Sequence, residues 1–224
     1  MMKYAKFYIL TLGVIILDQV IKLWVFNTMH LGQEIPVFGD WFKLHYTVNP
    51  GMAFGLQLGS EFGKLALTLF RLIAMTGIGY YLYYLIKKEV PMGLSWCIAL
   101  ILGGAVGNVI DSTLYGVLLD GNAPPNAPTP WFHGQVIDMF YVDIWEGKVA
   151  SWVPLFGGDY LSLWPIFNIA DASIFIGVAI ILIFQRSFFI EEKTEDKNLD
   201  IEAVSVTESV EKGDEEEEDK KQQA

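Results

Sequence analysis

Four long apolar runs constrain the fold of this chain more than any other feature of its sequence. They cover residues 4–26, 64–86, 92–115 and 165–185. A helix of about 20 mostly apolar residues crosses the hydrocarbon core of a bilayer, and lipid leaves a backbone few other ways to pair its polar groups. The sequence therefore predicts a membrane α-helical protein with four transmembrane helices.

Charge divides the chain into two parts. Residues 191–224 hold 14 acidic residues and 5 lysines, whereas residues 1–190 hold 12 acidic and 10 basic residues. The net charge of −11 is therefore mainly a property of the C-terminal segment. A charged segment without aromatic residues cannot bury enough apolar surface to fold. We expect a membrane domain over residues 1–190 and a disordered acidic cytoplasmic tail over residues 191–224.

Basic residues predict how the helices are oriented. Those at the helix ends, all on one side of the membrane, are Lys3, Lys6, Lys87, Lys88 and Arg186. Lysine and arginine mark the cytoplasmic side of a membrane protein. We therefore expect both termini in the cytoplasm and the two long loops, residues 27–63 and 116–164, on the extracytoplasmic side.

Two segments of these outer loops have the pattern of β-strands. Residues 42–48 alternate apolar and polar side chains, which is the period of a half-buried strand. Residues 135–142 are rich in residues that favour strands. A Pro-rich segment, residues 123–130, precedes the second of them. We expect a small extracytoplasmic β-sheet with irregular loops.

Polar residues inside the apolar runs indicate a functional site, because ionisable groups are costly in a membrane. Asp18 and Lys22 are spaced i,i+4 and are expected to form a structural ion pair. The pattern Asn-x-x-Asp occurs in the third and fourth runs, as Asn108 with Asp111 and as Asn168 with Asp171. In each case the two residues would share a helix face.

The depth of these residues suggests that they meet in one pocket. With Pro165 in the first helical turn, Asp171 would lie about 9 Å inward from it, at a depth similar to that of Asp111. Between the two runs stands Asp138, in the strand-like segment 135–142. A strand in the outer loop can hold this carboxylate over the pocket.

Asp138 and Asp171 together would form a carboxylate dyad. Two close carboxylates cannot both ionise easily, so one keeps a proton. The ionised partner can take a proton from water and the protonated partner can donate one to a carbonyl. This chemistry needs no metal and no cofactor. The three histidines have no metal-binding spacing.

Two other interpretations remain open from the residues. The buried acids could belong to a small proton-coupled membrane transporter. That function would need polar groups that continue toward the cytoplasmic half of the helices, and residues 96–102 and 175–184 have almost none. The Asn-x-x-Asp pairs could also be helix–helix hydrogen-bond contacts alone.

Five motifs together resemble those of lipoprotein signal peptidase (signal peptidase II), in the order in which that family has them. They occupy residues 18–22, 49–55, 104–111, 134–140 and 167–172. The resemblance extends over about residues 4–185. It implies a bacterial inner-membrane aspartic endopeptidase, without cofactor, that removes signal peptides before the diacylglyceryl-modified cysteine of prolipoproteins.

The resemblance also assigns roles to individual residues. It implies that Asp138 and Asp171 are catalytic and that six residues support the dyad or bind substrate: Asn49, Gly51, Phe54, Asn108, Asp111 and Asn168. Asp18 and Lys22 would be structural. The expected partners are the prolipoprotein signal peptide with its diacylglyceryl-cysteine and membrane lipids. We expect no nucleic acid partner and a monomer with its active site near the extracytoplasmic face.

The sequence departs from the family pattern in two places. The family usually has Arg after the Asp of its third-helix motif, and this chain has Ser112. A positive charge is therefore missing there or comes from elsewhere. The family usually has its first catalytic Asp nine residues after the same Asp, a position that Asp120 occupies, whereas Asp138 is 27 residues on. We favour Asp138, whose motif is fuller.

Overall fold

The computed structural model describes most of the chain up to residue 188. The described residues are 2–50, 61–88, 90–144, 146–148, 150–152, 157–158, 160–162 and 164–188. The expected acidic tail over residues 191–224 lies outside them, as do Gly51 and Phe54.

Three helices dominate the described residues, and each is long and apolar enough to cross a membrane. They are α1 (Met2–Thr28), α2 (Glu61–Lys87) and α3 (Met92–Ile110), which continues through a π-helical turn, Asp111–Tyr115, into the short α4 (Gly116–Leu118). Their lipid-facing sides carry exposed apolar side chains such as Ile9 and Ile73. A chain with these helices is a multi-pass membrane protein, as the sequence predicted.

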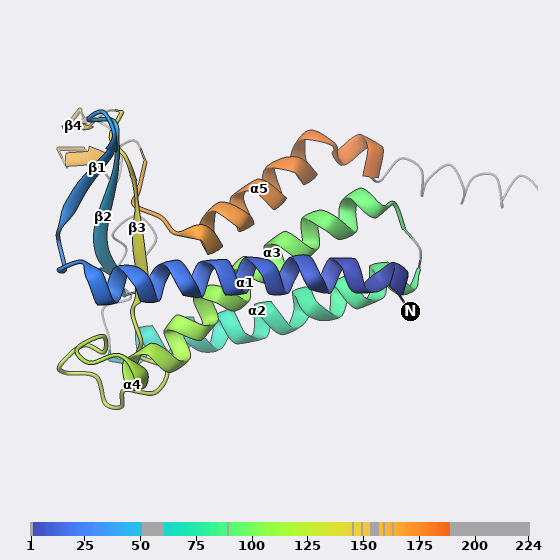
Figure 1. Ribbon diagram of the computed structural model, residues 1–224, viewed down its shortest axis with the longest axis horizontal. Coiled ribbons are helices and arrows are strands. Elements are labelled where there is room, and N and C mark those ends of the chain that lie inside the picture. Colours follow the sequence, from blue (N-terminus) through green and yellow to red (C-terminus); the bar gives the residue numbers. More distant parts are fainter. Residues whose placement is uncertain are drawn as a thin grey trace, which may run out of the picture. The chain divides into compact units, whose positions relative to one another are not determined.

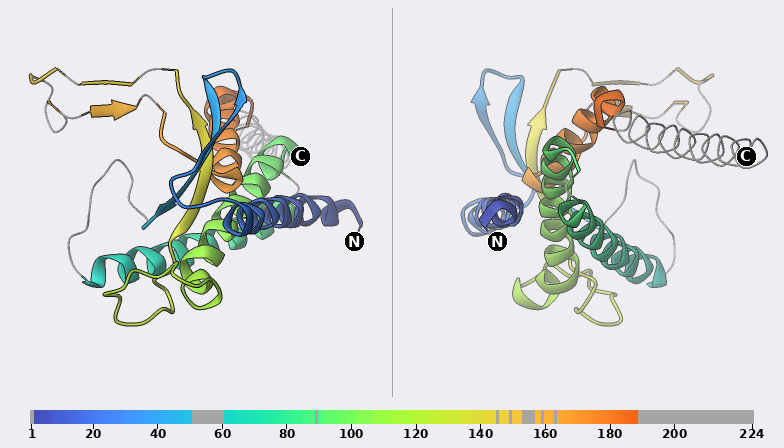
Figure 2. Two further views of the ribbon diagram at one scale, coloured as in Figure 1. Left: turned by 60° about the vertical axis from the view of Figure 1, so that its left-hand side comes forward. Right: turned by 90° about the vertical axis from the view of Figure 1, so that its right-hand side faces the viewer.

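Helix α3 lies between α1 and α2, and α5 (Ile169–Ile183) packs against it from another side (Figures 1 and 2). Glycines allow this central position. A Cβ atom added at Gly103 would lie 2.8 Å from Val14 Cβ of α1. One added at Gly104 would collide with the carbonyl oxygen of Ala170 in α5. Small residues therefore bring the backbones of α3 and α5 into direct contact.

The predicted small sheet is confirmed, and it has three strands in the order β1–β2–β3. They are β1 (Glu34–Phe38), β2 (Phe42–Asn49) and β3 (Val136–Val142), and neighbours are antiparallel. Two shorter strands, β4 (Glu146–Lys148) and β5 (Tyr160–Ser162), form a separate pair. In Figure 1 the three-stranded sheet lies at the end of the helices where α1 ends and α2 begins.

A small apolar core joins the sheet to the helices. Its buried residues come from the end of α1, the π-helical turn and two strands: Val25, Met29, Tyr46, Tyr115, Ile137 and Met139. Ile137 and Met139 are fully buried and flank Asp138 in β3. Burial of each such side chain contributes about 1.5–3 kcal/mol. The core therefore fixes the strand that carries Asp138 against the ends of α1 and α3.

The start of the fourth helix differs from the prediction. We expected the helix to begin at Pro165, but α5 begins at Ile169. The preceding Phe167 is extended and pairs with β3, since its N–H donates to the Phe140 carbonyl at 3.0 Å and its carbonyl accepts from the Phe140 N–H at 2.8 Å. This pairing delays the helix by one turn. Asp171 consequently lies in the first turn of α5 and not about 9 Å inside it.

The backbone contact between α3 and α5 predicts that Gly104→Ala destabilises the protein. The added methyl group has no free space, and forcing extra volume into a packed contact costs about 1–3 kcal/mol. Thermal unfolding in detergent should therefore occur at a lower temperature than in the wild type.

Gly13→Ala is the matched control for this substitution. Gly13 is also helical, but nothing lies within 4 Å of the added Cβ. This control should be as stable as the wild type or slightly more stable, by about 0.5–1 kcal/mol. Equal unfolding temperatures for Gly104→Ala and the wild type would show that the two helices can separate freely.

Candidate active site

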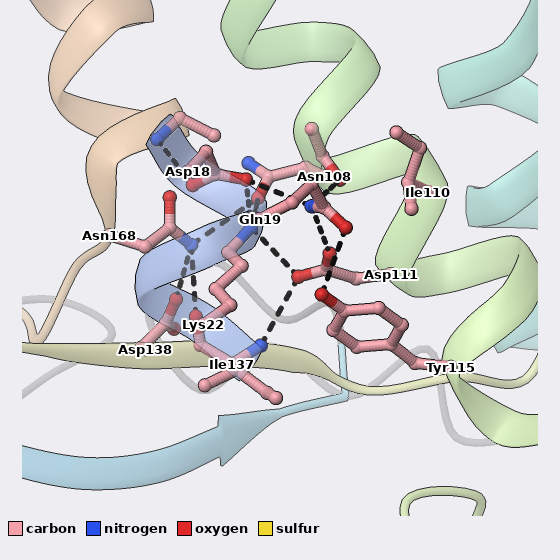
Figure 3. Close-up of polar contacts among 12 residues, drawn as sticks. Asp18, Gln19, Lys22, Asn108, Ile110, Asp111, Tyr115, Ile137, Asp138 and Asn168 are labelled. Atoms are coloured by element: carbon pink, nitrogen blue, oxygen red, sulfur yellow. Dashed lines mark hydrogen bonds and ion pairs between the residues drawn. The ribbon is translucent and has the colours of Figure 1, made fainter. Parts of the chain in front are cut away.

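A buried ion triad connects α1 to the end of α3. Lys22 Nζ lies 2.8 Å from Asp18 Oδ2 and 2.8 Å from Asp111 Oδ2, and all three side chains are fully buried. The expected Asp18–Lys22 pair is therefore present, but Lys22 also bridges to Asp111 in the π-helical turn that continues α3. Figure 3 shows this group of side chains between α1 and the π-helical turn.

Lys22 also orients Asn108. Its ammonium group donates to Asn108 Oδ1 at 3.1 Å, and an ammonium group can only donate. The amide oxygen of Asn108 therefore faces Lys22, and its amide nitrogen faces away, toward α5. That nitrogen donates to Asp171 Oδ1 at 2.8 Å.

Asn168 holds both members of the predicted dyad. Its Nδ2 atom donates to Asp138 Oδ1 at 2.6 Å, and its Oδ1 atom accepts from the backbone N–H of Asp171 at 2.9 Å. Asn168 is fully buried. One amide group thus joins Asp138 on β3 to Asp171 on α5, two acids that are 33 positions apart in the sequence.

The Asn168–Asp171 spacing is a helix cap and not a shared helix face, which corrects our prediction. Asn168 precedes the first helical residue and its side chain accepts the N–H of Asp171, while its own N–H lies 3.4 Å from Asp171 Oδ2. Such a reciprocal pair is a capping box. Asp18 adds a third contact, because its Oδ1 atom accepts the N–H of Ala170 at 2.9 Å.

Asp138 is in an environment that favours its neutral form. The carboxyl is almost fully buried, and burial together with the nearby Asp171 carboxylate raises its pKa from 3.8 to about 7. Hydrogen bonds from Asn168 and Asn49 oppose this effect only in part. Asp138 therefore keeps a proton up to about neutral pH.

The other predicted residues lie as follows. Asn49 ends β2 opposite Val136 and hydrogen-bonds to Asp138. Asp111 accepts from the backbone N–H of Ile137 at 3.4 Å, so it supports the strand that carries Asp138. Asp120, the alternative to Asp138, is exposed in the turn after α4.

The insertion between Asp111 and Asp138 folds back onto the helix from which it leaves. Gly134 N donates to the Ser112 carbonyl at 3.1 Å, and Phe132 N donates to the Thr113 carbonyl at 3.2 Å. Asn122 and Gln135 close the loop through two further hydrogen bonds. The insertion therefore returns the chain to its starting point, and β3 begins beside Asp111.

Sequence reasoning missed two polar residues of this region, Gln19 and Arg71. Gln19 donates to Asp111 Oδ1 at 3.0 Å and accepts from the Tyr115 hydroxyl at 2.9 Å. Arg71, within α2, donates to Ser112 Oγ at 2.8 Å. Gln19 and Arg71 are polar residues inside apolar runs. The same signal identified Asp18 and Lys22, and it would also have identified Gln19 and Arg71.

Comparison with known proteins places the chain among peptidases. The sequence model of the family described as signal peptidase (SPase) II matches residues 10–187. The lipoprotein signal peptidase of Amoebophilus asiaticus is 48% identical over 188 residues, which cover 83% of this chain and 79% of that protein. The lipoprotein signal peptidase of Porphyromonas gingivalis is 44% identical over 179 residues, covering 75% and 77% of the two chains.

A solved structure supports the same assignment. A bacterial membrane enzyme determined by the in meso method at 2.3 Å is 27% identical, with a TM-score of 0.55 over 82% of this chain and 88% of that one. The match therefore covers most of both chains and is not confined to one motif.

Lys22→Met is predicted to destabilise the protein strongly. The substitution leaves Asp18 and Asp111 buried without their cation, and breaking a buried ion pair in this way costs about 3–5 kcal/mol. The unfolding temperature in detergent should fall, and Asp111→Asn in the same chain should restore part of it. Lys87→Met, at an exposed lysine, should change little; an equally stable Lys22→Met protein would contradict the triad's role.

Asp138→Asn is predicted to stabilise the protein at high pH. Between 3.8 and about 7 the folded state holds a proton that the unfolded state has lost, so wild-type stability falls as pH rises through this window. Asparagine removes that penalty, which is at most about 4 kcal/mol. The unfolding temperatures of Asp138→Asn and the wild type should agree at pH 4 and differ at pH 8. Parallel curves would mean that Asp138 titrates normally.

Proposed function

The chain belongs to the signal peptidase II family, and from this premise we propose that it is an intramembrane aspartic endopeptidase acting on bacterial prolipoproteins. It cleaves before the diacylglyceryl-modified cysteine and so removes the signal peptide. Asp138 and Asp171 are the catalytic pair, and the reaction uses no cofactor.

The observation that carries this proposal is the sharing of Asn168 between the two acids. Asn168 donates to Asp138 and caps the helix that begins before Asp171. The high pKa of Asp138 supports its role as the acid, and Asp171 is then the base. An acid and a base held by one rigid amide meet the requirement for hydrolysis by activated water.

The proposed reaction has two steps. In the first, the Asp171 carboxylate takes a proton from water, the water oxygen bonds to the scissile carbonyl carbon, and Asp138 gives its proton to the carbonyl oxygen. In the second, the bond from carbon to nitrogen breaks. The leaving nitrogen takes the proton from Asp171, and a hydroxyl of the diol returns a proton to Asp138. Both acids recover their initial states.

A row of aromatic rings along the sheet supports a position for the substrate lipid beside the sheet. Phe38 and Phe42 stack with centroids 6.0 Å apart, Phe42 and Phe140 at 6.1 Å, and Phe140 meets Phe167 at 5.7 Å. Phe38 is largely exposed at the outer end of the row. Aromatic side chains favour the boundary between lipid and water. We infer that the diacylglyceryl group lies on this side, with Asn49 near the peptide.

The proposed topology has four spans and both termini in the cytoplasm of the bacterial cell, in its inner membrane. α5 would be the fourth span, and the basic residues at the helix ends support the orientation. The sheet and the two acids then lie near the extracytoplasmic face, where a prolipoprotein presents its cleavage site. The enzyme acts as a monomer in this proposal.

No observation favours the alternative of a proton-coupled transporter. The buried acids and amides gather near the ends of α1 and α3 that adjoin the sheet. In the opposite half of α3, the buried side chains among the described residues are Leu94, Ser95, Cys97, Ile98, Ala99 and Leu102, and none of them is a carboxylate or a histidine. A one-sided polar site is what a peptidase requires.

Cleavage of a lipid-modified prolipoprotein tests the proposed function. Asp138→Asn and Asp171→Asn should each lower kcat at least about 100-fold, since each removes one general acid or base. Asp120→Asn removes an exposed carboxylate of the same loop and is the matched control, with activity equal to that of the wild type. Cleavage products are measured in detergent or in membranes.

Three outcomes would contradict the proposal in different ways. Loss of activity in Asp120→Asn with activity retained in Asp138→Asn would keep the reaction but exchange the acid. Full activity of Asp171→Asn would exclude the two-acid mechanism. A wild-type protein that never cleaves the substrate would exclude the peptidase function itself.

A further inference from the structure

Arg71 is connected to the proposed base by a chain of hydrogen bonds. Its Nη1 atom donates to Ser112 Oγ at 2.8 Å, and the Ser112 hydroxyl donates to the Asn108 carbonyl at 2.9 Å. The Asn108 side chain then donates to Asp171 Oδ1 at 2.8 Å. Ser112 is fully buried and Asn108 nearly so. The guanidinium group of α2 therefore reaches Asp171 through two buried polar residues of α3 and its π-helical turn.

The carboxyl groups of the site favour a cation in this position. Lys22 is the shared partner of the Asp18 and Asp111 carboxyl groups, and in the proposed reaction one of the two catalytic acids is ionised. Four carboxyl groups, those of Asp18, Asp111, Asp138 and Asp171, thus lie in the hydrogen-bonded network around the Lys22 ammonium group. An uncompensated buried charge costs several kcal/mol. Arg71 is close enough to interact electrostatically with Asp171, Asp111 and Asp138.

We propose that Arg71 is a positioning residue that stabilises the ionised form of Asp171 and fixes Asn108 against it. The inference rests on the proposed function, because it assigns the role of base to Asp171. It also answers the departure at position 112. The cation that is absent from α3 comes from α2, and Ser112 is small enough to let the guanidinium group approach and accepts its hydrogen bond.

A purely structural role for Arg71 explains less. The contact between α2 and the insertion is already made by Thr68, whose hydroxyl lies 3.0 Å from the Phe132 carbonyl oxygen. Lys64, two turns before Arg71 and on the same helix face, is a like charge that opposes it. Two cations on one partly buried face raise the cost of folding. A functional demand for positive charge accounts for this arrangement.

The comparison of Arg71→Lys with Arg71→Gln separates the role of charge from that of hydrogen bonding. Lysine keeps the charge, whereas glutamine keeps a donor for Ser112 and loses the charge. Arg71→Gln should lower kcat by about tenfold or more, with KM within about twofold of the wild type. Arg71→Lys should retain most of kcat. Lys87→Gln, at an exposed lysine of the same helix, is the matched control and should be unchanged.

The pH profile gives a readout that a structural role would not move. Loss of the charge should shift the acidic limb of the kcat profile to higher pH in Arg71→Gln, because the base ionises less easily, and not in Arg71→Lys. The titratable or charged groups of the elements that surround Arg71 remain in place in both variants: Asp18, Lys22, Lys64, Asp111, Tyr115, His133, Asp138 and Asp171.

Several results would overturn this inference. They are equal loss of kcat in both variants, full activity of Arg71→Gln with an unshifted acidic limb, and an Arg71→Gln protein that does not fold. Infrared titration of the protonated carboxyl that disappears in Asp138→Asn needs no substrate. A different result combines a wild type that cleaves no prolipoprotein with a titration that still shifts in Arg71→Gln. That pair of results would overturn the proposed function and leave the role of Arg71 standing.

Discussion

The position of one ammonium group determines much of this structure. Lys22 lies between Asp18 and Asp111, and all three side chains are fully buried, so each group depends on the others. The same group sets the direction of the Asn108 amide, which in turn donates to Asp171. Asp18, held by Lys22, uses its second oxygen to bind the first turn of α5. The Asp18–Lys22 pair, which in the sequence could connect only two turns of one helix, therefore aligns α1, α3 and α5 around the two acids. Lys22 thus determines both the charge balance and the geometry of the site.

Local patterns in the sequence predicted the elements, and contacts between distant segments decided the rest. The length of the apolar runs predicted the three long helices, alternation predicted β2, and residues that favour strands predicted β3. The start of α5 could not be read locally, because Phe167 is kept extended by Phe140, 27 positions earlier. A spacing of three residues occurs both on a helix face and in a capping box. The spacing of Asn168 and Asp171 alone therefore could not show which of these arrangements they form. Arg71 was missed although the rule that polar residues are costly in lipid applied to it.

The insertion shows why distance along the chain was a poor guide to the choice between Asp120 and Asp138. A flexible loop adds little cost when it lengthens, since closure entropy grows only with the logarithm of its length. Here the loop begins after Leu118, and Gly134 brings it back to the π-helical turn by donating to the Ser112 carbonyl. Asp138 thus reaches the site after 27 residues, whereas Asp120 remains exposed. The apolar neighbours Ile137 and Met139 were the better indicator, because their burial in the core fixes the register of β3.

The contact between α3 and α5 has a consequence for how the protein responds to its lipid surroundings. At Gly104 the two helices touch through backbone atoms, with no side chain between them. Packed backbones are nearly incompressible, whereas side chains at a looser contact can change rotamer. Asn108 is one turn along α3 from this contact, and Asp171 follows Ala170 directly. The separation of these two residues is therefore insulated from changes in bilayer thickness or lateral pressure, which act on the outer faces of the helices.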